Sequence, residues 1–412
     1  MVDVVTFGCR LNAYESEVIR RNAEAAGLTE AVIFNTCAVT AEAERQARQA
    51  IRRARRERPG ARLIVTGCAA QISPDRFSAM PEVDAVLGNL EKTAPETFAG
   101  DARRVAVSDI MAASETAGHL IDGFEGRIRA FLQIQNGCDH RCTFCIIPYG
   151  RGPSRSVTPA DVVAQSLRLY ENGYRELVLT GVDVGDYGKD LSPPVGLAGL
   201  VRRLLDELPD DVRIRITSID PVEVDEALVQ MFADDPRLMP HWHLSVQSGD
   251  DMVLRRMARR HRRDDVMRVC AQLRAARPDT VVGADFIAGF PTETEAQFDN
   301  TVDLIERAGL SLLHVFPYSE REGTPAARLP QLDKGLRRER AARLRACGDG
   351  MLARTLQGFV GRTVGAVRED DGAARTDHFL ALDCAAGGTP GVHGRARITG
   401  ATPTSLIGGF DG

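Results

Sequence analysis

The chain has 412 residues, of which 43% are hydrophobic and 26% are charged, and its formal net charge is -5. This composition is typical of a globular protein, so a largely disordered chain and a uniformly basic nucleic-acid binder are both excluded. The length predicts two or three domains. No apolar run approaches the roughly 20 residues that cross a bilayer, and the N-terminus has no signal-peptide pattern. We therefore expect a cytoplasmic protein without a membrane partner.

Residues 1–111 are predicted to form a parallel three-layer α/β domain. Short β-branched runs alternate with stretches of helical period, and this alternation is typical of parallel βαβ units. The expected strands are residues 2–7, 31–35, 62–66 and 83–87, and the expected helices are residues 13–26 and 40–56. Residues 112–127 are rich in small residues and show little periodicity, which predicts a linker.

Residues 128–355 repeat the strand–helix alternation six times, and this spacing predicts a partial (β/α)6 barrel. The expected strands are residues 129–135, 176–180, 212–218, 243–246, 281–288 and 312–318. The expected helices are residues 159–172, 197–208, 223–232, 264–276 and 293–308, followed by an Arg-rich helix over 334–356. A full eight-unit barrel needs more chain than this segment provides.

Residues 356–412 differ in composition from the rest of the chain, because Gly, Thr and Val are frequent and no helical periodicity is present. Short strands are expected over residues 363–368, 379–382 and 394–398. This pattern predicts a small antiparallel β-barrel.

Three of the nine cysteines lie in the segment Cys138-Asp139-His140-Arg141-Cys142-Thr143-Phe144-Cys145, just beyond the first expected barrel strand. Thiols stay reduced in the cytoplasm, so this regular spacing indicates a metal or catalysis rather than disulfides. Iron–sulfur clusters commonly take four Cys, and three ligands leave one iron open. The C-x3-C-x2-C spacing fits the radical S-adenosylmethionine signature, in which the open iron chelates that cofactor. The alternative is a zinc site with His140 as its fourth ligand.

Three further cysteines, Cys9, Cys37 and Cys68, each follow an expected strand of the N-terminal domain. Loops at the carboxyl ends of parallel strands gather at one edge of the sheet, which is the usual ligand edge. The three thiols are therefore predicted to meet and to hold a second iron–sulfur cluster. The alternative is three unrelated buried cysteines, which are common in protein cores.

The sequence resembles the methylthiotransferases of the radical S-adenosylmethionine class over nearly its whole length. The likeness is carried by the six cysteines, by the segment from Gln135-Asn136-Gly137-Cys138 to Pro148-Tyr149-Gly150-Arg151-Gly152, and by a C-terminal barrel similar to a TRAM domain. Several segments look most like the branch that acts on threonylcarbamoyladenosine in tRNA. These are Gly8-Cys9-Arg10-Leu11-Asn12, Ser218-Ile219-Asp220-Pro221, residues 241–249 and residues 314–319. The other bacterial branches modify isopentenyladenosine in tRNA or an Asp of a ribosomal protein.

This resemblance implies an enzyme with two [4Fe-4S] clusters and S-adenosylmethionine. The cluster on Cys138, Cys142 and Cys145 would reduce the cofactor, and the resulting 5′-deoxyadenosyl radical would activate carbon 2 of adenosine 37. The cluster on Cys9, Cys37 and Cys68 would hold the sulfur that becomes the methylthio group. The two sites must then face one cavity. A reductant such as flavodoxin or ferredoxin is implied, and no catalytic residue beyond the cluster ligands stands out. The rival hypotheses are an N-terminal cluster that only relays electrons, and an RNA-binding protein with structural zinc.

Five residues are candidates for contacts to S-adenosylmethionine. Catalytic groups of barrels lie at the carboxyl ends of the strands, and Phe144 lies between two ligating cysteines. The candidates are Phe144, Gly181, Asp183, Ser218 and Asp285. The alternative for each is ordinary turn chemistry at a strand end, with Gly181 serving backbone geometry.

Basic residues gather in three runs, residues 45–62, 255–263 and 337–345. Local basic patches on an acidic chain suit a phosphate backbone, here the anticodon stem-loop of tRNA, and a solvated face is the alternative. The candidate RNA contacts are Arg48, Arg52, Arg55, Arg259 and Arg260. The C-terminal barrel has five Arg and six acidic residues, so its surface is not notably basic.

Overall fold

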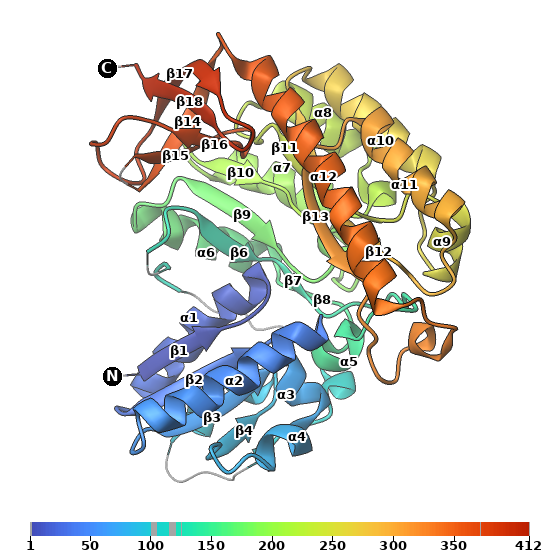
Figure 1. The fold of residues 1–412 in the computed structure, drawn as a ribbon. Coiled ribbons are helices and arrows are strands. Elements are labelled where there is room, and N and C mark those ends of the chain that lie inside the picture. Colours follow the sequence, from blue (N-terminus) through green and yellow to red (C-terminus); the bar gives the residue numbers. More distant parts are fainter. Residues whose placement is uncertain (1, 100–104, 115–120, 125, 371, 412) are drawn as a thin grey trace.

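The computed structural model describes residues 2–99, 105–114, 121–124, 126–370 and 372–411, and in Figure 1 it shows three units along the chain. A parallel α/β unit, coloured blue, lies below a curved sheet that is green to orange, and a small β-barrel, coloured red, lies at the far end. Among the described residues, no helix is long and apolar enough to cross a membrane.

The N-terminal unit is a five-stranded parallel sheet in the order β1-β2-β3-β4-β5. Its strands are β1 (Val2–Thr6), β2 (Ala31–Thr36), β3 (Arg62–Gly67), β4 (Ala85–Leu87) and β5 (Val105–Ala106), and its helices are α1 (Arg10–Ala25), α2 (Ala41–Glu57), α3 (Cys68–Ile72) and α4 (Pro74–Ser78). Ile19 of α1 packs with Ile33 and Ile64 on one face. Ile51 of α2 packs with Phe34 in a cluster on the other face. The predicted three layers are confirmed, and β5 is an addition that the sequence did not predict.

The central unit has the six predicted parallel strands in two three-stranded sheets, β6-β9-β10 and β11-β12-β13. The strands are β6 (Ala130–Gln133), β9 (Glu176–Thr180), β10 (Arg213–Arg215), β11 (His241–Gln247), β12 (Val281–Ala288) and β13 (Leu312–Pro317). Two isolated parallel bridges, Ile214–Leu238 and Ile219–Leu244, join the sheets across β10 and β11. The result is one curved, open barrel, as predicted.

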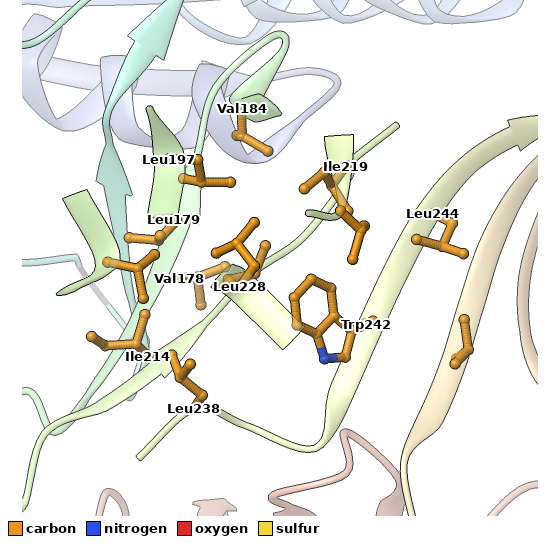
Figure 2. Packing of buried hydrophobic residues seen from close by; sticks show 14 of the residues in the cluster. Val178, Leu179, Val184, Leu197, Ile214, Ile219, Leu228, Leu238, Trp242 and Leu244 are labelled. Atoms are coloured by element: carbon orange, nitrogen blue, oxygen red, sulfur yellow. The ribbon is translucent and has the colours of Figure 1, made fainter. Parts of the chain in front are cut away.

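Helices cover the convex face of this barrel (Figure 1). They are α6 (Pro159–Glu171), α7 (Leu197–Glu207), α8 (Glu226–Asp234), α9 (Asp251–Arg256), α10 (Arg263–Ala276), α11 (Glu295–Ala308) and α12 (Lys334–Phe359). Figure 2 shows part of the core, in which Trp242 of β11 lies near Leu228 of α8. The Trp242 ring meets Phe232 edge-on at 5.5 Å between centroids, so aromatic and branched residues fill the space where the two sheets meet.

The C-terminal unit is a closed five-stranded barrel in the order β14-β15-β16-β18-β17. Its strands are β14 (Thr363–Asp370), β15 (Ala373–Thr376), β16 (Ala381–Asp383), β17 (His393–Ala401) and β18 (Leu406–Phe410). The barrel was predicted to be antiparallel, and one of its pairs, β16 with β18, is instead parallel. This pair closes the barrel between strands that are not neighbours in the sequence, so no hairpin turn sets its direction.

The N-terminal unit contacts both edges of the open barrel. Tyr14 of α1 packs on Phe124, with 6.4 Å between ring centroids, and Phe124 packs on Phe131 of the edge strand β6 at 5.4 Å. At the other edge, the Ala41 amide of α2 donates to Ser319 Oγ at 3.2 Å, just beyond β13. The sheet of the N-terminal unit thus spans the opening of the barrel. Of the predicted linker 112–127, residues 115–120 and 125 lie outside the described residues, and the three predicted boundaries between the segments stay predictions.

Candidate functional site

The three N-terminal cysteines follow neighbouring parallel strands and meet at one edge of the sheet. Cys9 caps α1 after β1, Cys37 follows β2, and Cys68 opens α3 after β3. A side chain at Gly8 would meet Cys37 Cβ at 2.7 Å, and Gly8 has φ +96°, so only glycine lets the loop pass this close. Burial raises the pKa of Cys37 to about 12, and Cys68 acts in the same direction. Three thiolates here require a cationic partner.

A buried ionic network holds this edge against the barrel. Arg151, at the end of α5 (Ile147–Arg151), donates from Nε to Cys68 Sγ at 3.0 Å and from Nη2 to Glu15 Oε2 at 2.8 Å. The same nitrogen donates to Asn12 Oδ1 at 2.5 Å. Lys92 Nζ donates to the same Glu15 oxygen at 2.6 Å, and its side chain is fully buried. Arg151 therefore links the barrel to a cysteine of the other unit.

The second cysteine group lies in a loop that a two-stranded ladder closes. The strands β7 (Gln135–Asn136) and β8 (Arg155–Ser156) pair on either side of residues 137–154. The Gln135 side chain donates to the Gly137 carbonyl at 2.8 Å and accepts from the Asp183 amide at 2.9 Å. It therefore fixes the start of the loop to the end of β9. The predicted strand 129–135 includes Gln135 but did not separate β7 from β6, and β8 was not predicted, because each of these strands has only two residues.

The two cysteine groups are close to each other. Burial, with smaller contributions from Cys142 and then Cys68, raises the pKa of Cys145 to about 12. A side chain at Gly150, in the helix that follows Cys145, would meet Cys68 Cβ at 3.2 Å. Because Gly150 has no side chain, α5 packs directly on the N-terminal cysteine edge.

Two adjoining cavities lie between the cysteine groups and the barrel strands. One of about 430 Å³ is lined by Cys9 and Cys37 together with strand-end residues of the barrel. A second of about 260 Å³ is lined by Phe144 and Cys145. Both cavities are lined by Asp285 and Phe316, so together they form one chamber that both cysteine groups face.

Four of the five predicted cofactor residues line this chamber: Phe144 in the smaller cavity, Gly181 and Ser218 in the larger, and Asp285 in both. A side chain at Gly181 would meet Gln135 Oε1 at 2.9 Å, so this glycine permits a close approach. Asp183 points elsewhere: it accepts from Cys138 Sγ at 3.6 Å and pairs with His140 at 2.8 Å.

Asp285 lies between two histidines that the sequence reasoning did not select. His243 Nε2 and His314 Nδ1 lie 3.0 and 3.1 Å from the same Asp285 oxygen, Oδ1. Burial would raise the pKa of Asp285, but the hydrogen bonds from the two histidines outweigh burial and lower it. The carboxylate therefore stays ionised in the chamber. The spacing of these residues in the sequence gives no signal for this cluster, because it forms across three different strands.

A third cavity, of about 610 Å³, adjoins the chamber at Gly8, Cys9 and Arg10. Four arginines line it, and Phe131 and Phe379 supply apolar wall. The arginines are Arg10, Arg127, Arg129 and Arg215. Burial lowers the pKa of Arg10, and the charge of Arg215 lowers it further. The cavity therefore concentrates positive charge beside the cysteine chamber.

Of the five predicted RNA-contact residues, three bond to other groups of the protein and two remain at least partly exposed. Arg55 donates to the backbone carbonyls of Glu82 and Ala61 and to Asp84, so α2 uses this side chain internally. Arg259 donates to Asp220 at 2.9 Å and to Cys142 Sγ at 3.6 Å, and Arg260 pairs with Glu223. Arg48 is partly exposed, and Arg52 is 53% exposed with Glu82 at 3.9 Å.

In the Arg-rich run over residues 337–345, Arg337 and Arg340 are buried, whereas Arg338, Arg343 and Arg345 are exposed. Arg337 donates to Gln331 at 2.9 Å, and Arg340 pairs with Glu293 at 2.8 Å. Arg343 lies 4.4 Å over the Phe298 ring and pairs with Glu295 at 2.5 Å. These residues attach α12 to the barrel, which explains why the helix is rich in arginine.

An open six-stranded barrel with a three-cysteine loop at its mouth defines a radical S-adenosylmethionine protein. The profile of the Radical SAM superfamily matches residues 132–305, and that of Uncharacterized protein family UPF0004 matches residues 1–88. Among solved structures, the radical S-adenosylmethionine methyltransferase TsrM from Kitasatospora setae aligns with TM-score 0.53 and 16% identity, over 77% of this chain and 70% of that chain. This likeness concerns the fold alone.

Curated relatives narrow the class to a family. The chain is 51% identical to Threonylcarbamoyladenosine tRNA methylthiotransferase MtaB of Rickettsia prowazekii (strain Madrid E), over 92% of this chain and 90% of the relative. It is 38% identical to the Bacillus subtilis (strain 168) protein of the same name, over 84% of this chain and 79% of that relative. It is 36% identical to tRNA-2-methylthio-N(6)-dimethylallyladenosine synthase of Cereibacter sphaeroides (strain ATCC 17023), over 98% and 97%. The chain belongs to the radical S-adenosylmethionine tRNA methylthiotransferase family, in the threonylcarbamoyladenosine branch.

Proposed function

We propose that this protein transfers a methylthio group to carbon 2 of N6-threonylcarbamoyladenosine at position 37 of tRNA. The observation that carries the proposal is the chamber in which Cys9 and Cys37 of one unit face Gly181, Ser218 and Asp285 of the other. Relatives that are 51% and 38% identical carry this activity in their names, against 36% for the dimethylallyladenosine synthase. The isopentenyladenosine alternative is therefore less supported.

The cysteine groups fit two [4Fe-4S] clusters. The radical S-adenosylmethionine domain implies one cluster and the cofactor itself, for which Cys138, Cys142 and Cys145 are the ligands on the matched segment. We propose that Cys9, Cys37 and Cys68 hold the second. Each group has an arginine N–H directed at a sulfur: Arg259 to Cys142 at 3.6 Å and Arg151 to Cys68 at 3.0 Å. Hydrogen bonds to the sulfurs are a normal feature of such clusters.

The zinc alternative needs a fourth ligand beside Cys138, Cys142 and Cys145. His140 was the candidate, and its Nε2 instead pairs with Asp183 at 2.8 Å. Three thiolates without a fourth protein ligand suit a cluster with one open iron better than a closed zinc site.

When bound, the two clusters and S-adenosylmethionine supply the electron, the 5′-deoxyadenosyl radical and the methylthio group that the reaction consumes. The chain places these groups around one chamber. Phe144 and Phe316 provide apolar wall, and Gly181 lets Gln135 pack against the backbone that lines the chamber. Asp285, kept ionised by His243 and His314, is an acceptor for a hydroxyl or ammonium group of the cofactor. In this proposal the anticodon stem-loop reaches the chamber from outside, and a flavodoxin or ferredoxin is the reductant. Acting on tRNA places the enzyme in the cytoplasm.

Mass spectrometry of tRNA nucleosides from cells that lack the protein tests the substrate. We expect 2-methylthio-N6-threonylcarbamoyladenosine to disappear while the isopentenyl product persists. Loss of the isopentenyl product alone would reject the proposed substrate. If neither product changes in cells without a second methylthiotransferase, the proposal is wrong.

The purified enzyme tests the two cysteine groups separately. Cys9→Ala should lower iron from about eight to about four atoms per chain, keep 5′-deoxyadenosine formation and abolish methylthio transfer. Cys145→Ala should abolish both reactions, whereas Cys270→Ala, a buried core cysteine, serves as the control. If Cys9→Ala keeps methylthio transfer, the second cluster has no role in it.

A further inference from the structure

The third cavity has charge that the protein does not neutralise. Within the described chain, the Arg10 guanidinium has no hydrogen-bond or ion-pair partner, although it lines two cavities. Behind it, Arg215 is 1% exposed and its Nη2 has no hydrogen-bond partner. Arg129 Nη1 is likewise buried without a partner. Leaving such donors unsatisfied costs free energy, and an anionic ligand bound by Arg10 would place a compensating charge beside the two buried donors.

The remaining bonds of these arginines fix them in place. Arg215 Nε donates to Glu176 at 2.7 Å and its Nη1 to the Asp377 carbonyl at 3.0 Å. Arg129 pairs with Glu369 of the C-terminal barrel. Their guanidinium groups lie 5.0 and 5.3 Å from the centroid of the Phe379 ring. Three units of the fold therefore build this wall, and its free donors are preorganised.

The position of the cavity indicates what it receives. It meets the cysteine chamber at Cys9 and Arg10, so a group there lies beside a base whose carbon 2 is in the chamber. In adenine, carbon 2 and the N6 substituent sit on the same pyrimidine ring and only nitrogen 1 separates their carbons. The N6 substituent of the target base therefore extends from the chamber toward an adjoining wall.

We propose that Arg10, backed by Arg129 and Arg215, binds the carboxylate of the N6-threonylcarbamoyl group. This inference rests on the proposed substrate and assigns the residues that select it. An isopentenyl group in the same place would carry no charge and would leave Arg10 and the free donors of Arg129 and Arg215 without an anionic partner. The cavity thus favours the threonylcarbamoyl base and disfavours the isopentenyl base.

The test compares three anticodon stem-loop RNAs with the reconstituted holoenzyme. They carry threonylcarbamoyladenosine, its carboxamide analogue or plain adenosine at position 37. For the wild type, kcat/KM for methylthio transfer should be about 10- to 100-fold higher for the acid than for the amide. Arg10→Gln should lose this factor for the acid, so that its acid and amide rates agree within about threefold. Binding of the plain-adenosine RNA should stay unchanged.

The controls separate the possible failures. Arg203→Gln on α7, an exposed residue paired with Glu207, should keep the full preference for the acid. Arg10→Lys keeps a positive charge and should retain part of the preference for the acid. The ratio of acid to amide rates depends only on the enzyme molecules that are active. This ratio can therefore be measured even if Arg10→Gln binds less iron than the wild type.

A full preference in Arg10→Gln would overturn the inference. Equal weakening of all three RNAs would also overturn it, since Arg10 would then contact a backbone phosphate. A wild type that does not act on the threonylcarbamoyl RNA would instead overturn the proposed function itself.

Discussion

Substituting Arg151 tests how the two cysteine groups are held together. The guanidinium is 2% exposed and bonds Glu15, Asn12 and Cys68 of the N-terminal unit. Met has similar length and no charge, so Arg151→Met removes these donors with little change in volume. It leaves the Glu15 carboxylate, which is 4% exposed, with Lys92 as its remaining cationic partner.

The magnitude follows from Glu15. Burial raises the pKa of this carboxyl, but Arg151 and Lys92 outweigh burial and lower it from 4.5 to about 2. At about 1.4 kcal/mol per pH unit, the folded state gains about 3 kcal/mol from the ionised carboxylate. Breaking a buried ion pair costs about 3–5 kcal/mol. Because Lys92 shares the interaction, we expect Arg151→Met to lower the free energy of unfolding by about 2–3 kcal/mol at pH 7.

Urea unfolding of the cluster-free protein, followed by circular dichroism, measures this loss, and hydrogen exchange should locate it in α1 and α5. The pH dependence has a defined sign. A lowered carboxyl pKa stabilises the fold fully above pH 4.5, and the stabilisation disappears as the pH falls toward 2. The difference between the wild type and Arg151→Met should therefore shrink as the solution is acidified below pH 4.5.

Two further variants decide whether the loss arises from uncompensated charge. The triple variant Arg151→Met, Glu15→Gln, Lys92→Met removes all three charges and should recover most of the stability. Arg203→Met, at an exposed pair, should cost less than about 0.5 kcal/mol. A loss under about 1 kcal/mol in Arg151→Met, or a triple variant no more stable than the single one, would refute the reasoning.

Two other predictions concern the cysteine edge and the basic surface. Gly8→Ala places a Cβ 2.7 Å from Cys37 Cβ and should therefore remove iron from the N-terminal site. In Gly60→Ala the new Cβ has no neighbour within 4 Å, so this control should keep the iron. Equal iron contents in the two variants would contradict the prediction. The double variant Arg48→Glu, Arg52→Glu should weaken tRNA binding as measured by filter binding. The slope of the logarithm of the binding constant against the logarithm of the salt concentration should become smaller by about 2. Arg55 donates its hydrogen bonds to groups inside the fold, so Arg55→Gln should leave this salt dependence unchanged. The substitution should instead lower the free energy of unfolding by about 1–2 kcal/mol. An unchanged slope in the double variant would mean that this face does not contact RNA.

The sequence predicts the large elements of this fold because each has a strong local signal. Most barrel strands lie in apolar runs, and the N-terminal cysteines occupy equivalent loops after three successive strands. The elements that were missed are all short. The strands β5, β7 and β8 have two residues each, β15 has four and β18 has five. The helices α3, α4, α5 and α9 have five or six residues each. The parallel pairing of β16 with β18 depends on barrel closure, which no local pattern encodes.

The residues that surround the cysteines were harder to predict, because their partners are far away in the sequence. Arg151 bonds Glu15 from 136 positions away, and Lys92 bonds Glu15 from 77. Runs of charged residues are hard to interpret for the same reason. Arg259 and Arg260 were predicted to form a basic patch, but in the structure they pair with Asp220 and Glu223. A net charge counted along the chain does not register acids that the fold brings from another segment.

Arg151 also explains why the two cysteine groups keep a fixed relation although they belong to different units. It follows the second cysteine loop closely in sequence and donates to a sulfur of the first group. Gly150, beside it, lets α5 lie directly on Cys68. A shift of α5 therefore moves the loop that holds Cys145 and breaks the bond to Cys68 at the same time. A reaction that needs one carbon atom within reach of both groups requires this coupling, and packing between α1 and β6 alone does not provide it.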